Sequence, residues 1–203
     1  MPSFLEVVRA RRMVRAYRGE PVDPEVVDRI LDIARRGPSA GWTQAVSFVV
    51  VTDAGQRWRV AEACGEPRYV DRGFDPWVSR APVLVVPCVR KAAYEERYAE
   101  PDKAVSCPPD QWPVPFWWVD AGAALMLLLL AVVDEGLAAG FLGAHAGRLR
   151  RVLGIPADVA PLGVVTIGHP APDRRSGSLA RGRRPLSEIV HHDCWRQTPL
   201  APA

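Results

Sequence analysis

The sequence predicts a single α+β domain over residues 1–203, because strand and helix patterns alternate along the chain. Three β-branched runs between turn residues predict strands, and amphipathic or wholly apolar stretches between them predict helices. With 203 residues, of which 48% are hydrophobic, the chain is long enough to bury a substantial core.

The first third of the chain predicts two helices. Ser3 is placed to cap a helix that runs to about Arg12, since its hydroxyl can accept a backbone N–H. Asp23 is placed to cap a second helix that Gly37-Pro38 ends. The residues that we expect to point inward from the second helix are Val26, Val27, Ile30, Leu31 and Ile33.

The remaining elements follow from the same patterns. Residues 47–51, 83–86 and 163–167 predict strands, and residues 56–64 predict a helix. The run 121–133 is the most apolar stretch, but Asp120 and Asp134 bracket it and leave it too short to cross a bilayer. It therefore predicts a buried helix, covered by its own domain together with a partner subunit.

Residues 90–118 predict a long irregular segment, because five prolines interrupt the part up to residue 115. We expect this segment to be a lid over a substrate site. It contains six aromatic residues, which are Tyr94, Tyr98, Trp112, Phe116, Trp117 and Trp118. They suit the wall of a site for a planar ligand, with Trp112 and Phe116 as candidate substrate contacts, or they pack the segment onto the core or a subunit interface.

Charge and cysteine content restrict the function classes. Two lysines leave 24 arginines to carry nearly all the positive charge, which favours anion recognition by guanidinium groups. The arginines are scattered among acids, so a nucleic-acid surface is weakly supported. Four scattered cysteines and the adjacent residues 191–194 give no plausible metal site. The charged N-terminus lacks the apolar core of a secretion signal, and we expect a cytoplasmic protein with no membrane partner.

Three segments suit one phosphorylated ring cofactor, and we expect that cofactor to be a flavin. They are residues 11–15 (Arg-Arg-Met-Val-Arg), 38–44 (Pro-Ser-Ala-Gly-Trp-Thr-Gln) and 181–185 (Arg-Gly-Arg-Arg-Pro). Guanidinium groups hold a phosphate dianion through paired hydrogen bonds and keep their charge. Both ends of the chain supply such groups.

In this order, with the apolar helix between them, these segments resemble the nitroreductase family of FMN-dependent oxidoreductases, and the resemblance spans nearly the whole chain. It implies a three-layer α-β-α sandwich with a mainly antiparallel sheet, in an intertwined homodimer. It also implies transfer of a hydride from NADH or NADPH through flavin N5 to an electron-poor small molecule such as a nitroaromatic or a quinone.

The resemblance also implies the site residues. Those that match the FMN-binding positions are Arg11, Arg12, Met13, Arg15, Pro38, Ser39, Ala40, Gly41, Gln44, Leu142, Gly143, Ala144, Arg181 and Arg183. The arginines would hold the phosphate, the 38–44 loop would line the ring from the other subunit, and a backbone N–H at Gly143 or Ala144 would approach N5. Met13 replaces the usual serine, and Trp42 replaces the usual asparagine and is a candidate substrate contact. No catalytic side chain is implied.

Other functions remain compatible with the same residues. A specialised flavin enzyme would dehydrogenate or dehalogenate a dedicated metabolite, or would use oxygen. A non-enzymatic protein would store flavin or bind nucleic acid. A deazaflavin donor also stays open.

Overall fold

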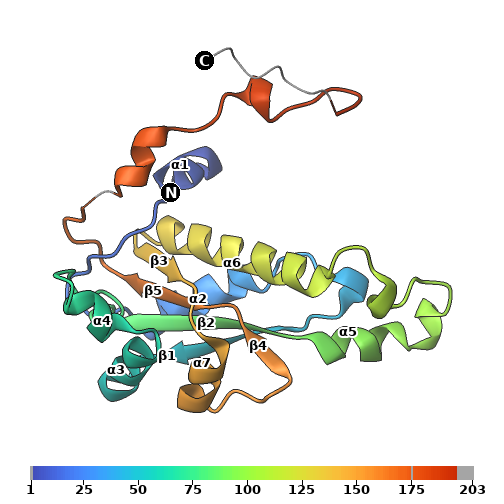
Figure 1. The fold of residues 1–203 in the computed structure, drawn as a ribbon, viewed down its shortest axis with the longest axis horizontal. Coiled ribbons are helices and arrows are strands. Elements are labelled where there is room, and N and C mark those ends of the chain that lie inside the picture. Colours follow the sequence, from blue (N-terminus) through green and yellow to red (C-terminus); the bar gives the residue numbers. More distant parts are fainter. Residues whose placement is uncertain (1, 175, 196–203) are drawn as a thin grey trace. The chain divides into compact units, whose positions relative to one another are not determined.

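The computed structural model describes residues 2–174 and 176–195, and it separates into two compact units. The first unit ends at Asp173, and the second begins at Arg174. Every described α-helix and strand belongs to the first unit (Figure 1). The second unit contains two 3₁₀ turns, Gly177–Arg181 and Leu186–Glu188. The single domain over residues 1–203 therefore stays a prediction.

The first unit is built around a five-stranded antiparallel sheet. Its main path runs in the order β1 (Val46–Val51), β2 (Val83–Arg90), β5 (Val164–Gly168), β3 (Ala138–Leu142). The short β4 (Val159–Pro161) pairs with the end of β2 that β5 leaves free. The three predicted strands are confirmed. The sequence patterns do not predict β3, which has no β-branched residue, or β4, which has only three residues.

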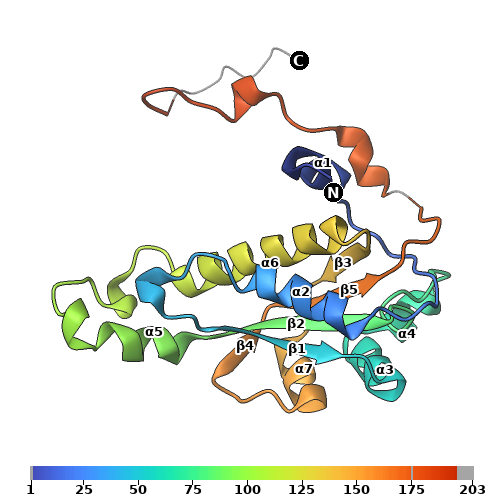
Figure 2. The same ribbon diagram turned by 180° about the vertical axis from the view of Figure 1, so that it is seen from behind.

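Helices cover both faces of the sheet, so the unit has three layers (Figures 1 and 2). One face packs against α2 (Pro24–Ala34) and α6 (Phe116–Asp134), and the other packs against α3 (Ala54–Ala63) and α7 (Ala146–Leu153). Side chains of β2 alternate between these two cores, with Val83 and Val85 in one and Leu84 and Val86 in the other. The predicted α-β-α sandwich is confirmed.

The first two helices begin where the sequence predicts. Ser3 and Glu6 form a reciprocal capping box at the start of α1 (Phe4–Ala10), and the Asp23 carboxylate accepts the Glu25 backbone N–H at the start of α2. Helix α1 ends at Ala10, slightly earlier than expected. Ile33, expected inside, is 44% exposed, whereas Ala34 is buried.

Helix α6 is only partly covered within its own chain. It is the one helix in the described residues that is long and apolar enough to cross a membrane, with a mean hydropathy of 2.1, yet one side of it packs on the sheet through Leu128 and Val132. Only 39% of this stretch is buried, so the prediction that its own unit covers one part of it is confirmed. Apolar side chains that stay exposed are Phe116, Trp118, Val119 and Met126.

The segment 90–118 is more regular than predicted. Arg90 ends β2, and residues Lys91–Tyr98 form α5, followed by 3₁₀ turns at Pro101–Lys103 and Pro109–Gln111. The expectation of an unbroken irregular segment is wrong here because the run Lys-Ala-Ala-Tyr-Glu-Glu-Arg-Tyr contains no proline or glycine and favours a helix. Its role as a lid stays a prediction.

Candidate functional site

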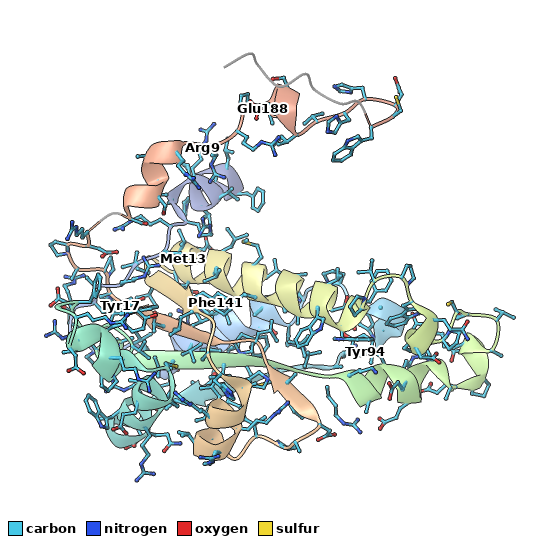
Figure 3. The ribbon with its side chains drawn as sticks, in the orientation of Figure 1. Arg9, Met13, Tyr17, Tyr94, Phe141 and Glu188 are labelled. Carbon is cyan, nitrogen blue, oxygen red and sulfur yellow. The ribbon has the colours of Figure 1, made fainter. Side chains whose placement is uncertain are left out.

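The N-terminal arginine segment runs along the edge of β3. Met13 forms a parallel bridge to Ala139, and the Val14 N–H donates to the Ala139 carbonyl over 2.9 Å. A β-carbon at Gly140 would collide with the Val14 carbonyl oxygen, so this close approach requires glycine. Figure 3 shows Met13 beside β3. The backbone thus fixes Arg11–Arg15 beside the sheet.

Each arginine of this segment has a different environment. Arg12 lies 3.6 Å from the Asp173 carboxylate, which also accepts the Arg15 backbone N–H over 3.0 Å. The Arg15 guanidinium lies over the Trp77 ring, 5.5 Å from its centre. Within the described part of the first unit, neither Arg11 nor Arg15 has a carboxylate partner. Arg12 is therefore partly neutralised, whereas the charges of Arg11 and Arg15 are available to an anion.

Tyr17 fixes the end of the segment from inside the core. Its hydroxyl donates to the Val14 carbonyl over 2.8 Å and lies 2.6 Å from the Thr166 hydroxyl. Burial raises the pKa of Tyr17 above its ordinary value, so the phenol stays neutral. Figure 3 shows this side chain at the same end of the unit as Met13. Sequence patterns do not identify Trp77 or Asp173, because both are far from residues 11–15 in the sequence. They do not identify Tyr17 either, because its contact with Thr166 spans 149 residues.

The predicted ring-lining loop is a tight turn with unusual backbone angles. Residues Ala40–Trp42 form a 3₁₀ turn, and the Ser39 hydroxyl accepts the Gln44 N–H over 2.7 Å. Gly41, Trp42 and Gln44 have φ angles of 63°, 58° and 53°. This left-handed region is uncommon for a bulky residue such as tryptophan. Trp42 is nonetheless 74% exposed, so burial of its side chain within this chain does not offset the energetic cost of that backbone conformation.

A buried carboxylate anchors this loop. Asp120 on α6 is 4% exposed, and its Oδ2 atom accepts the Ala40 N–H over 2.8 Å and the Tyr94 hydroxyl over 2.7 Å. Helix α5 adds a second anchor, since Arg97 donates to the Gly41 carbonyl over 2.9 Å. Burial, followed by the hydrogen bond and charge of Asp120, raises the pKa of Tyr94. Tyr94 belongs to α5, and its hydroxyl reaches Asp120 on α6 (Figure 3).

Aromatic rings pack behind the same loop. Trp112 makes edge contacts with Tyr94, Tyr98 and Phe116, and its indole N–H donates to the Cys107 carbonyl over 2.9 Å. A β-carbon on Gly41 would clash with the Tyr98 ring. Of the two interpretations of these aromatic residues, packing onto the core describes Trp112, whereas a substrate contact by Trp112 or Phe116 stays a prediction.

The third predicted contact region follows β3. Leu142 and Ala144 pack on the core, whereas Gly143 between them is exposed and has open space where a β-carbon would stand. Gly143 is three residues after Gly140, which touches the arginine segment, so their Cα atoms lie at most about 11 Å apart. The arginine segment and the 142–144 segment therefore belong to one region.

The 38–44 loop belongs to a different region of the same chain. It is tied to Asp120 near the start of α6, whereas the arginine segment pairs with β3, which follows the end of α6 (Figures 1 and 2). The 14 residues from Asp120 to Asp134 correspond to about 21 Å of helix. One protomer therefore does not bring these two groups of predicted residues together.

The late arginines lie in the second unit. Gly182, with a φ of 67°, separates the exposed Arg181 and Arg183, and Arg184 pairs with Glu188 over 3.0 Å. Convergence of Arg181 and Arg183 with Arg11 and Arg15 stays a prediction.

Comparisons with known proteins agree with this architecture. The sequence model of the nitroreductase family matches residues 8–169. An FMN reductase (NAD(P)H) from Bacillus subtilis is 30% identical over 202 residues, which cover 96% of this chain and 75% of that relative. The solved structure of the hypothetical oxidoreductase YcnD from Bacillus subtilis has a TM-score of 0.74 at 25% identity, over 97% of this chain and 76% of that chain. Nitroreductase A from Vibrio parahaemolyticus gives 0.73 at 24% identity, over 98% and 78%.

Proposed function

This chain belongs to the nitroreductase family, and we propose that it is an FMN-dependent oxidoreductase that takes a hydride from NADH or NADPH and passes electrons to an electron-poor small molecule. Nitroaromatics, quinones and other conjugated compounds are the proposed acceptors, in a ping-pong reaction. The observation that carries the proposal is the position of residues 11–15 along β3, next to the exposed backbone at Gly143.

The charges of that region fit a flavin phosphate. Arg11 and Arg15 would bind it, joined by Arg181 and Arg183, while Arg12 is held by Asp173 and has a secondary role. The Arg15 guanidinium already lies over Trp77, so binding would cost little further side-chain ordering. Met13 would contact the ring side without a hydrogen bond, since a thioether is a weak acceptor.

The open backbone at Gly143 fits the reactive edge of the cofactor. Bound FMN would supply N5 as the atom that accepts and releases the hydride. Leu142 and Ala144 anchor this backbone in the core, and the absence of a side chain at Gly143 allows a flat ring to approach an N–H donor there. The protein's part in the chemistry would be positioning and exclusion of water.

The separation of the 38–44 loop from residues 11–15 supports a homodimer. A loop that lines the same ring with Pro38, Ser39, Ala40, Gly41 and Gln44 must come from a second copy, because in one chain it is tied to the far end of α6. Apolar side chains that a second copy could cover are exposed on α1 and α6; they include Phe4, Leu5, Trp118 and Met126. Two sites would then form between two chains.

The visible spectrum of the purified protein tests the cofactor and the reaction together. We expect a yellow protein that NAD(P)H bleaches anaerobically and that an acceptor restores. Arg11→Ala with Arg183→Ala should release FMN while the circular dichroism spectrum is retained, whereas Arg59→Ala, an exposed arginine on α3, should not. Full FMN affinity in the double variant would refute the phosphate assignment.

Subunit complementation tests the shared site. Arg15→Ala damages the phosphate side, and Gly41→Val damages the ring loop. If each site combines the arginines of one chain with the loop of the other, a heterodimer of these variants has one intact site and should bind one FMN. Heterodimers that bind no FMN would place both segments in the same protomer.

Trp42 favours a second candidate, a flavin enzyme specialised for one metabolite. Its ring is exposed on a left-handed backbone that the anchors at Asp120 and Arg97 hold in place. Residues held in sparsely populated backbone regions cluster at active sites and ligand contacts. Trp42→Asn should then abolish turnover of the dedicated substrate and spare general acceptors.

The non-enzymatic alternatives have their own tests. A protein that only stores flavin would stay oxidised with NAD(P)H, and nucleic-acid binding would be lost with rising salt. We also propose a cytoplasmic protein that acts without nucleic acid or membrane.

A further inference from the structure

The first unit contains a pocket outside the segments assigned above. It has a volume of about 280 Å³ and is partly open to solvent. It lies between the end of α3, the short helix α4 (Glu66–Val70) and helix α7. The residues that line it are Cys64, Gly65, Arg68, Tyr69, Arg72 and Arg148.

Three guanidinium groups line this pocket without a carboxylate to balance them. In the described part of the first unit, Arg68, Arg72 and Arg148 form no ion pair and no side-chain hydrogen bond, although Asp71 is adjacent to Arg72 in the sequence. Arg97, by contrast, is held by two carboxylates. All three arginines are exposed, so their donors are open to an anion, which would gain charge-assisted hydrogen bonds by binding between them.

The other lining groups suit binding rather than chemistry. Burial, and to a lesser extent the charge of Glu66, raises the pKa of the Cys64 thiol to about 12, so it carries almost no thiolate at neutral pH. The Tyr69 ring is 56% exposed, and Phe74 supports it with an edge contact at 6.3 Å between ring centres. Tyr69 thus offers an aromatic surface beside the three cations.

The pocket also lies within reach of a dinucleotide that is bound at the proposed hydride-transfer region. Arg148 is five residues after Gly143, so their Cα atoms are at most about 18 Å apart. Cys64 packs against the same core cluster as Leu142 and Ala144. An extended dinucleotide with its nicotinamide near Gly143 is long enough to reach a pocket at this separation.

We propose that this pocket binds the phosphorylated ribose at the adenosine end of NADPH, and that the protein therefore prefers NADPH to NADH. The inference rests on the proposed function for the hydride step, but the pocket's affinity for the phosphate does not. Arginine is the usual partner of the 2′-phosphate that distinguishes the two donors. The volume fits a phosphate and its sugar rather than a whole dinucleotide, and Tyr69 would contact the adenine.

The kinetic test follows anaerobic bleaching of the holoenzyme by each donor. Two variants remove guanidinium groups from the pocket: Arg148→Ala, and the double variant Arg68→Ala with Arg72→Ala. Each should lower the affinity for NADPH about tenfold, as expected for a lost charge-assisted hydrogen bond. The rate of flavin reduction at saturating NADPH should be unchanged. The affinity for NADH and the rate of flavin reduction at saturating NADH should each change less than twofold. Arg148→Lys should retain part of the affinity, and Arg59→Ala, an exposed arginine outside the pocket, should match the wild type.

A direct binding test does not depend on flavin reduction. Adenosine 2′-monophosphate should bind the full-length protein in calorimetry, compete with NADPH, and lose affinity in Arg148→Ala; adenosine 5′-monophosphate should bind more weakly. The proposal is overturned by a wild type that prefers NADH, by equal effects on both donors, by loss of FMN in the variants, or by no Arg148-dependent binding of the 2′-phosphate. A protein that neither donor bleaches would refute the proposed function, and the calorimetry would still decide the pocket.

Discussion

The Asp120 carboxylate offers a quantitative test of how the 38–44 loop is held. Its Oδ2 atom accepts hydrogen bonds from the Ala40 backbone and from the Tyr94 hydroxyl, and Tyr94 is fully buried. Hydrogen bonds to a charged acceptor contribute about 1.5–3 kcal/mol each. Because the carboxylate is buried and none of the described residues supplies a cation to it, part of this gain is offset by its desolvation. We therefore expect Asp120→Ala to lower the free energy of unfolding by about 3 kcal/mol.

Asp120→Asn is the matched control, since its amide oxygen can still accept both hydrogen bonds. Neutral hydrogen bonds are about half as strong, so we expect a loss of about 1–2 kcal/mol. Tyr94→Phe removes one bond only and should lose a similar amount. For a chain of this size, 3 kcal/mol corresponds to a fall in Tm of roughly 6–12 °C.

Urea unfolding of the holoprotein, followed by circular dichroism, measures these losses. FMN affinity, measured by flavin fluorescence, should be lower in Asp120→Asn than in the wild type and lowest in Asp120→Ala. If Asp120→Ala unfolds within about 0.5 kcal/mol of the wild type, the carboxylate does not anchor the loop, and the reasoning fails. A large loss of stability with unchanged FMN affinity would show instead that the loop does not line the flavin.

Three further predictions concern separate features. Gly140→Ala should lower the Tm and weaken FMN binding together, because the new methyl group pushes the arginine segment off β3; unchanged values for both would contradict the close packing there. With iodoacetamide at pH 8, the exposed Cys107 should be labelled well before Cys64, as followed by mass spectrometry. Burial raises the pKa of Cys64 to about 12, which leaves roughly one thiolate in ten thousand at this pH. Equal labelling rates would contradict the burial of Cys64. Burial raises the pKa of Tyr17, so the unfolded chain loses the phenol proton at a lower pH than the folded chain. The free energy of unfolding should therefore decline as pH rises above about 10. Unfolding measurements at several pH values should show a smaller decline in Tyr17→Phe.

The sequence alone determined the elements whose signals are local. The caps at Ser3 and Asp23, the strands of β-branched residues and the long apolar helix all follow from side chains a few residues apart. The helix at Lys91–Tyr98 escapes prediction because the prolines that follow it dominate the local composition. The arginine and loop segments, in order along the chain, sufficed to indicate the family.

Only the tertiary structure decided which of those segments meet. Strand pairing puts Met13 against Ala139 across more than a hundred residues, and no local pattern encodes that contact. The same folding ties the 38–44 loop to Asp120, away from the arginines, which is why one chain alone does not assemble the predicted site. The pocket of Arg68, Arg72 and Arg148 likewise exists only because α3, which leads into α4, packs beside α7 on one face of the sheet. Such contacts depend on long-range packing, whereas capping, periodicity and short motifs depend on neighbours in the chain.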